Sequence, residues 1–243
     1  MKNTIDWKGL STRKKLKYIW DYYKLPLFAC LILLYIAIYT GYRIITHRDM
    51  LLYAAAVNIT DSKELKARLK DDFLSSIGYD KKHEDMTLYT RLYLTTDKDS
   101  EYYTYSYASE MKLIGALEAK RLDVVLMDRE SFDAFCANGY LCEIDSFLKK
   151  NCPDFYEEHK DDLVKNTIIL SDNADEVSRD KSIEYKAETK DALLGLSMSQ
   201  SGFYKDLGFS DEMLLGVIKD TAREGAASKY VEFLYITCAY DEE

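Results

Sequence analysis

The strongest hydrophobic pattern in the chain is an uncharged run of 18 residues, from Leu25 to Tyr42. Lys24 and Arg43 bound this run, and their long side chains can reach outward to the headgroups of a bilayer. A membrane-spanning helix needs about 20 mostly apolar residues, with a lower limit of roughly 17. We therefore predict a helix over residues 25–45 that spans the membrane and contacts its lipid.

The chain after this run alternates between apolar segments of strand length and segments of helical periodicity. Residues 51–59 are almost continuously apolar, which is typical of a strand covered on both faces. The predicted strands cover residues 51–59, 86–94 and 122–127, and the predicted helices between and after them cover residues 65–77, 102–120 and 131–137. This order predicts an α/β fold with a mostly parallel, doubly wound sheet.

The pattern is less regular after residue 145. We expect a helix over 153–165, a strand pair at 167–170 and 182–186, strands at 192–198 and 213–218, and a closing helix over 225–236.

The predicted helix over 102–120 has a single apolar face. This face is indicated by the spacing of Tyr103, Tyr107, Met111, Ile114 and Leu117.

Charge is distributed unevenly about the apolar run. Residues 1–24 carry a net charge of +5, whereas residues 50–243 hold 24 of the 33 basic and 39 of the 42 acidic residues. Basic flanks remain on the cytoplasmic side of a membrane. The domain division is therefore a cytoplasmic tail over 1–24, the helix, and an extracytoplasmic domain over 46–243. The acidic domain disfavours nucleic acid as a partner, because phosphate binding needs a basic face.

Two alternatives to an uncleaved anchor stay open. A cleaved signal peptide also has a basic start and an apolar segment, but no small-residue cleavage site follows this run. A lipoprotein would carry lipid on a cysteine, and residues 27–30 loosely match the motif that directs it. However, Cys30 lies at the start of the apolar run rather than after it. We favour a single-pass anchor in the cell membrane.

One longer stretch resembles a known family. Residues 111–128 read MKLIGALEAKRLDVVLMD, and Phe132, Phe135, Gly139-Tyr140-Leu141 and Ile144-Asp145 follow. The stretch resembles the extracellular solute-binding proteins of the type 2 periplasmic-binding fold. In that family a helix leads into a similar Asp-containing strand. Residues 214–218 and the helix that ends at 230–234 resemble the family's return strand and closing helix.

The resemblance implies one periplasmic-binding-protein-like lobe in a membrane-anchored module that binds a small solute or a peptide. Family members usually enclose the ligand between two full lobes, whereas only residues 146–213 remain here for a reduced second lobe. The alternative is an assembly or interaction subunit that docks on another membrane or envelope protein without a small-molecule ligand.

Ligands of doubly wound sheets bind at the carboxyl ends of the strands. The predicted ligand-binding residues at those ends are Thr60, Asp61, Ser62, Thr95, Thr96, Asp128 and Arg129. Helix amino termini nearby would favour an anion or a carboxylate. The competing interpretation is that Asp61 and Ser62 only cap a helix and that Asp128 and Arg129 only form a turn.

No catalytic motif accompanies these residues, so we do not expect an enzyme, and no cofactor is predicted. His47, His83 and His159 lack the spacing of a metal site. Cys136 and Cys142 flank a Gly turn and could form a disulfide, or remain buried free thiols.

Overall fold

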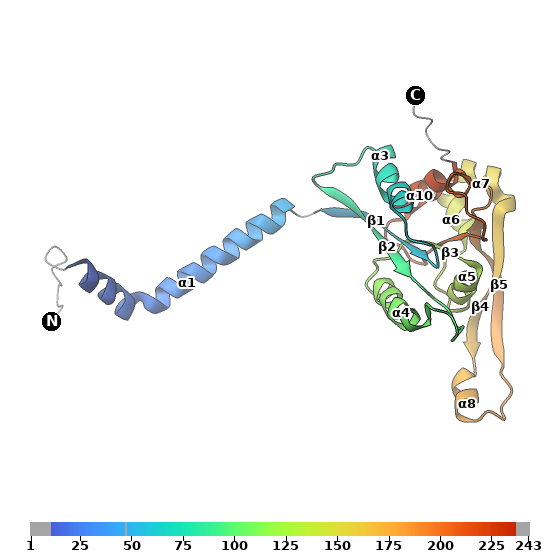
Figure 1. Ribbon diagram of the computed structural model, residues 1–243, viewed down its shortest axis with the longest axis horizontal. Helices are drawn as coiled ribbons and strands as arrows, with labels where there is room; N and C mark the ends of the chain where they lie inside the picture. The colour runs from blue at the N-terminus through green and yellow to red at the C-terminus, as the bar shows by residue number, and fades with distance from the viewer. Residues whose placement is uncertain (1–10, 47, 237–243) are drawn as a thin grey trace. The chain divides into compact units, whose positions relative to one another are not determined.

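The computed structural model of the chain describes residues 11–46 and 48–236. The chain divides after Arg48 into two compact units. The first unit contains helix α1 (Thr12–Thr46), which begins earlier than the predicted residue 25. Pro26 lies inside α1 and removes one backbone hydrogen bond, which bends a helix. Figure 1 shows α1 with such a bend.

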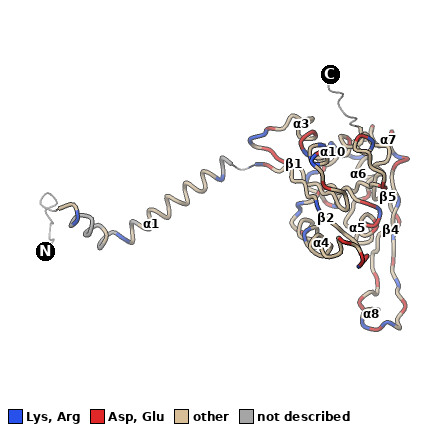
Figure 2. The backbone as a smooth tube through the Cα atoms, in the orientation of Figure 1, with Lys and Arg blue, Asp and Glu red and all other residues tan. Residues whose placement is uncertain are grey.

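Helix α1 is long and apolar enough to span a membrane. Its segment Lys24–Arg43 has 20 residues and a mean hydropathy of 1.9, and it is not buried against any described part of the chain. Figure 2 shows the long uncharged stretch within this helix. The predicted span 25–45 therefore lies within one helix, while residues 1–10 of the predicted tail lie outside the described residues.

The second unit is built on one six-stranded sheet in the order β2-β1-β3-β6-β5-β4. The strands are β1 (Asp49–Val57), β2 (Glu84–Leu92), β3 (Val124–Met127), β4 (Leu163–Asp172), β5 (Ala187–Ser197) and β6 (Leu214–Val217). Strand β1 pairs in parallel with both β2 and β3, as predicted. The other three neighbour pairs are antiparallel, yet four of the six strands point in the same direction.

Helices cover both faces of the sheet, which confirms the predicted two-sided burial of β1. Leu52 and Ala54 of β1 face one apolar cluster, and Ala55 and Val57 face the other. Helices α4 (Tyr103–Glu118) and α5 (Arg129–Ala137) cover the second face. The first face is covered by α2 (Lys63–Lys66), a π-helical segment (Ala67–Asp72), α3 (Phe73–Ser76), α6 (Ile144–Asn151), α7 (Pro153–His159), α9 (Gly202–Asp206) and α10 (Glu224–Ile236).

Residues 146–213 do not form a separate lobe. The expected helix 153–165 ends as α7 at His159, and β4 begins at Leu163, where Val164, Ile168 and their neighbours favour a strand. Strand β4 pairs with β5 rather than with the expected strand at 182–186, because that segment lies in the turn region after α8 (Ala174–Arg179). The β4–β5 hairpin extends well beyond the rest of the sheet (Figure 1).

A buried carboxylate joins the amino ends of β3 and α10 to the middle of β1. Asp123 accepts a hydrogen bond from the backbone N–H of Tyr53 at 2.8 Å, and its own N–H donates to the Tyr53 carbonyl at 2.9 Å. The Arg223 guanidinium contacts the same carboxylate and donates to the Met50 carbonyl at 3.2 Å. The aspartate of the family-like motif therefore holds elements together at the end of the sheet opposite to the predicted ligand site.

Candidate functional site

Asn58 organises the carboxyl ends of the three parallel strands. It follows β1 with a φ of 55°, a left-handed conformation that Asn tolerates better than most residues. Its side-chain oxygen accepts from the Leu94 N–H at 2.8 Å, and its nitrogen lies 2.7 Å from the Leu94 carbonyl and 3.0 Å from Asp128 Oδ2. We did not predict this residue from the sequence, although an Asn directly after a buried strand is a signal for such a turn.

A polar hollow of about 260 Å³ lies at these strand ends. Three of the predicted residues, Thr60, Thr95 and Asp128, line it. Sequence reasoning missed its other main residues, which are Tyr93, Ser100, Tyr102 and Glu130. The rings of Tyr93 and Tyr102 stack at the hollow with centroids 4.3 Å apart. The geometry of parallel strands therefore brings part of the predicted set together, as the sequence implied.

Asp61 and Ser62 do not line the hollow among the described residues. Ser62 caps α2 by accepting a hydrogen bond from the Leu65 N–H at 2.9 Å. Asp61 Oδ2 accepts from Lys66 Nζ at 2.9 Å and from Arg91 Nε at 2.7 Å. These hydrogen bonds to Lys66 and Arg91 hold the pKa of Asp61 below its usual value. Ser62 is therefore a helix cap, as the competing interpretation holds, whereas Asp61 caps no described helix and forms ion pairs with Lys66 and Arg91 instead.

Arg129 does not line the hollow either and pairs with Glu212 instead. Its Nε lies 3.6 Å from Glu212 Oε2, and its guanidinium lies 5.9 Å from the centre of the Phe132 ring. Asp128 meanwhile caps α5, because its Oδ1 accepts from the Ser131 N–H at 3.1 Å. The amino terminus of α5 is therefore occupied by a carboxylate of the same chain. Without Arg129 the hollow is negatively charged, which suits a cation better than the anion expected from the sequence.

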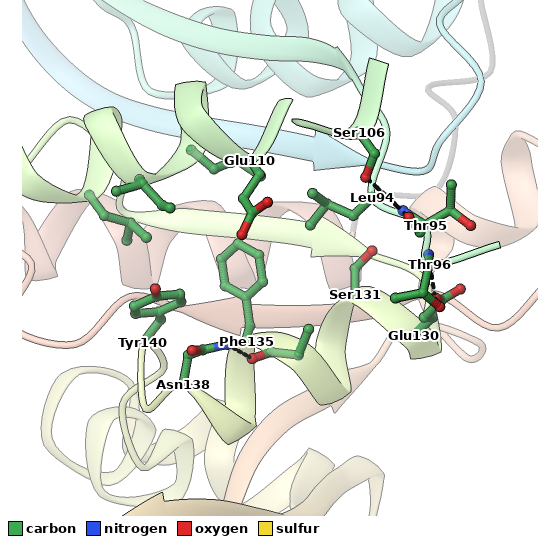
Figure 3. A pocket seen from close by; sticks show the side chains of 14 residues that line it. Leu94, Thr95, Thr96, Ser106, Glu110, Glu130, Ser131, Phe135, Asn138 and Tyr140 are labelled. Atoms are coloured by element: carbon green, nitrogen blue, oxygen red, sulfur yellow. Dashed lines mark hydrogen bonds between the residues drawn. The ribbon is translucent and has the colours of Figure 1, made fainter. Parts of the chain in front are cut away.

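A second, mostly apolar groove of about 270 Å³ lies between α4 and α5 (Figure 3). Its apolar lining is Leu94, Leu113, Ile114, Leu117, Ala134, Phe135 and Tyr140. Figure 3 shows Glu110 reaching from α4 toward Phe135, with Thr96 and Glu130 at the other end of the groove. Thr96 donates to Glu130 from its N–H at 3.3 Å and from its hydroxyl at 3.1 Å. The predicted Thr96 therefore lines this groove instead of the hollow.

The hollow and the groove are neighbours. Leu94, Thr95 and Glu130 line both of them. A molecule bound across this region would therefore meet an acidic, aromatic site and an apolar one at the same time.

The amino-terminal part of the apolar face predicted for α4 is exposed, whereas Ile114 and Leu117 of the same face are half-buried. Tyr103, Tyr107 and Met111, which we call the α4 stripe, have 40 %, 72 % and 51 % of their surface exposed. Leu113 and Ala116 on another side of the helix pack against the sheet instead. The prediction was therefore wrong for Tyr103, Tyr107 and Met111, which face outward, while Leu117 packs against the core as predicted.

Two serines explain which side of α4 packs. Ser109 Oγ accepts from the Tyr93 N–H at 3.0 Å, and Ser106 Oγ accepts from the Thr95 N–H at 3.1 Å. Both N–H groups lie beyond the end of β2, where backbone pairing with β1 has ended. Each N–H group therefore needs another hydrogen-bond acceptor. Hydrogen bonding therefore overrides the spacing of apolar residues and leaves a second apolar face on α4.

Cys136 and Cys142 are free thiols, and no disulfide joins them. Cys136 packs in the cluster on one face of the sheet, and Cys142 packs against the cluster on the other face. Burial raises the pKa of both thiols to about 12, so they remain protonated at neutral pH. Among the described residues, no group of three His, Cys, Asp or Glu side chains could hold a metal ion.

Comparisons with protein families, with curated proteins and with solved structures gave no match to this chain.

Proposed function

We propose that the chain is a membrane-anchored interaction module that binds a segment of a protein partner outside the cytoplasm. The α4 stripe carries this proposal. Large aromatic and methionine side chains are enriched at protein interfaces, and a cluster of them on a water-exposed helix needs a reason. The stripe continues into the groove through Ile114, which lies three positions after Met111 and lines the groove.

The anchor is the membrane-spanning segment of α1. At 1.5 Å per residue a helix of about 20 residues covers the hydrocarbon thickness of a bilayer. The basic residues that precede Lys24 favour a cytoplasmic amino terminus, and the acidic domain then lies on the other side. A module held in this way would act on partners at or near the membrane surface.

A small solute enclosed between two lobes has less support. Residues 146–213 extend the same sheet and provide no facing lobe. The polar groups at the strand ends are largely occupied by one another, as the contacts of Asn58 and Asp128 illustrate. A solute-binding module of the resembled family therefore remains the second candidate, supported by the hollow alone.

The test uses the full chain in its membrane, with a photo-crosslinking amino acid at Tyr107. The matched control carries the same group at Tyr185, a half-exposed tyrosine near the end of the hairpin. We expect a discrete adduct from position 107 only. The crosslinked protein, once purified, should bind the wild-type chain and should lose binding to a Tyr107→Ser, Met111→Ser variant.

Two results would contradict the proposal. One is a partner that binds the double variant as well as it binds the wild type. The other is the absence of an adduct together with a specific rise in unfolding temperature from one member of a panel of sugars, amino acids and phosphates. That second result would favour the solute-binding candidate.

The orientation of the domain has its own test. A protease added outside intact cells should digest the domain, and full protection of the domain would refute the orientation.

A further inference from the structure

We infer that the partner segment is a cationic and apolar peptide, which places a Lys or Arg side chain in the hollow and a large apolar side chain in the groove. This inference rests on the proposed function and names the chemistry of the partner. It follows from four observations: the charge of the hollow, its aromatic pair, the apolar groove beside it, and the absence of internal counter-charges among the described residues.

The carboxylates at the site have no cationic partner in the described part of the chain. Glu130 accepts only from Thr96, and Asp128 accepts from Asn58 and from the Ser131 N–H. Glu110 reaches toward the groove with no ion pair among the described residues (Figure 3). Neither the hollow nor the groove is lined by a described Lys or Arg. Among the described residues, no Lys or Arg balances the negative charge of this surface, so it is complementary to a cationic group.

The shape of the hollow suits a long cationic side chain better than a compact ion. Tyr93 and Tyr102 stack at its edge, and aromatic rings attract Lys and Arg both by their apolar surface and by cation–π contact. Asp128 and Glu130 provide acceptors for the charged head in the same hollow. A guanidinium or an ammonium could therefore pair with carboxylates while its stem contacts the rings.

The groove supplies the second half of the recognition. It is lined mainly by carbon atoms of Leu94, Ile114, Leu117 and Phe135, and it shares Leu94 and Glu130 with the hollow. Apolar side chains that enter such grooves dominate peptide affinity, and a charge beside them adds selectivity. Because the two recesses adjoin, residues close together in one peptide can fill both.

The net negative charge of the whole domain also favours a cationic partner. Residues 50–243 carry 39 acidic and 24 basic residues. A domain with this excess attracts basic segments over distance and speeds their encounter, an effect that weakens as salt is added.

The test is a selection of phage-displayed random dodecapeptides on the full chain in lipid nanodiscs. We expect the selected peptides to combine Lys or Arg with Leu, Ile, Phe, Trp or Met. A synthetic selected peptide should lose about tenfold in affinity when its cation is replaced by Gln, consistent with the loss of one charge-assisted hydrogen bond. This loss should become smaller on a Glu110→Gln, Glu130→Gln variant, in which Asp128 is the one described carboxylate that still lines the hollow.

Controls separate this inference from the proposed function. Glu176→Gln, on the exposed helix α8, should leave affinity unchanged. Equal unfolding temperatures show that each variant is folded. If selected peptides lack a cation, or if binding ignores the two Gln changes, the inference is wrong. The proposed function would still hold in that case, provided that Tyr107→Ser abolishes binding.

Other occupants give different results, and each of them would overturn the inference. If the selection yields no peptide, the inference and the proposed function are both refuted. The same holds if the selected peptides bind equally well to the wild type, to Tyr107→Ser and to the variant with the two Gln changes. Thermal stabilisation by spermine without peptide selection would assign the hollow to a small cation. A dimer in nanodiscs that is lost on Tyr107→Ser would assign the face to a second copy of the chain.

Discussion

Arg223 donates from its Nη1 to both carboxylate oxygens of Asp123, at 3.2 and 3.4 Å, although the two residues lie 100 positions apart in the sequence. The same guanidinium covers the ring of Tyr53 at 4.5 Å. Asp123 is 1 % exposed, so its carboxylate oxygens depend on these partners for their hydrogen bonds. The pair therefore connects the start of the sheet with the start of the last helix.

Removal of this carboxylate should destabilise the second unit strongly. In Asp123→Ala the Arg223 charge and the Tyr53 N–H lose their buried acceptor, and we expect a loss of about 3 kcal/mol in the free energy of unfolding. Asp175→Ala on the exposed helix α8 should change it by less than about 0.5 kcal/mol. Urea unfolding followed by near-ultraviolet circular dichroism measures both, and equal effects would contradict the assigned role.

Close packing between β5 and α5 gives a second prediction. A Cβ atom on Gly195 would lie 2.5 Å from Cε2 of the buried Phe132 ring, so Gly195→Ala should cost about 1–3 kcal/mol. Replacing the ring with a smaller side chain by Phe132→Leu should relieve the clash. The double variant should therefore lose less free energy of unfolding than the two single variants lose together.

The control for this prediction is Gly115→Ala in α4, where an added Cβ meets no atom within 4 Å. That change should stabilise the helix by up to about 1 kcal/mol. Additive effects at Gly195 and Phe132 would show that the hairpin does not rest on this contact.

The lowered pKa of Asp61 predicts a dependence of stability on pH. Its ordinary value is 3.8, and the hydrogen bonds from Lys66 and Arg91 lower it in the folded state. The contribution should be fully present above the unfolded value and should disappear as the pH falls through the lower folded value. Asp61→Asn should therefore flatten the acid limb of the stability curve. An unchanged acid limb would show that the ion pairs do not stabilise the fold.

Thiol reactivity tests the burial of the cysteines. Because Cys136 is buried, Cys142 is half-buried and both have raised pKa values, both should react slowly with iodoacetamide in the folded chain and rapidly in urea. A Ser178→Cys variant supplies an exposed thiol on α8 for comparison. Mass spectrometry of the tryptic peptides reports each site. A peptide in which Cys136 and Cys142 are crosslinked would refute their assignment to opposite faces.

The parallel half of the fold could be predicted from the sequence because its signals are local. Continuous apolarity marks β1 and β3, and helical spacing places Leu65, Leu69 and Phe73 against the sheet. The β4–β5 pairing was not predictable in the same way, because it depends on two segments that find each other across a polar loop.

The candidate site was predictable to the same limited extent. Thr60, Thr95 and Asp128 meet because parallel strands end at one edge of a sheet. The stacking of Tyr93 on Tyr102 depends on the path of the intervening loop, and the contact of Arg129 with Glu212 depends on a segment far along the chain. The orientation of α4 depends on hydrogen bonds to Ser106 and Ser109 that hydrophobic spacing does not encode.

The position of β6 has a consequence for the timing of synthesis. This strand lies between β3 and β5 and is the last strand of the sheet to leave the ribosome. Until residues 214–217 are available, the half-sheet made of β1, β2 and β3 and the hairpin of β4 and β5 have no strand between them. The domain must therefore complete its folding late, after most of it has emerged, and this interval is when its apolar edges are most open to aggregation or to a chaperone.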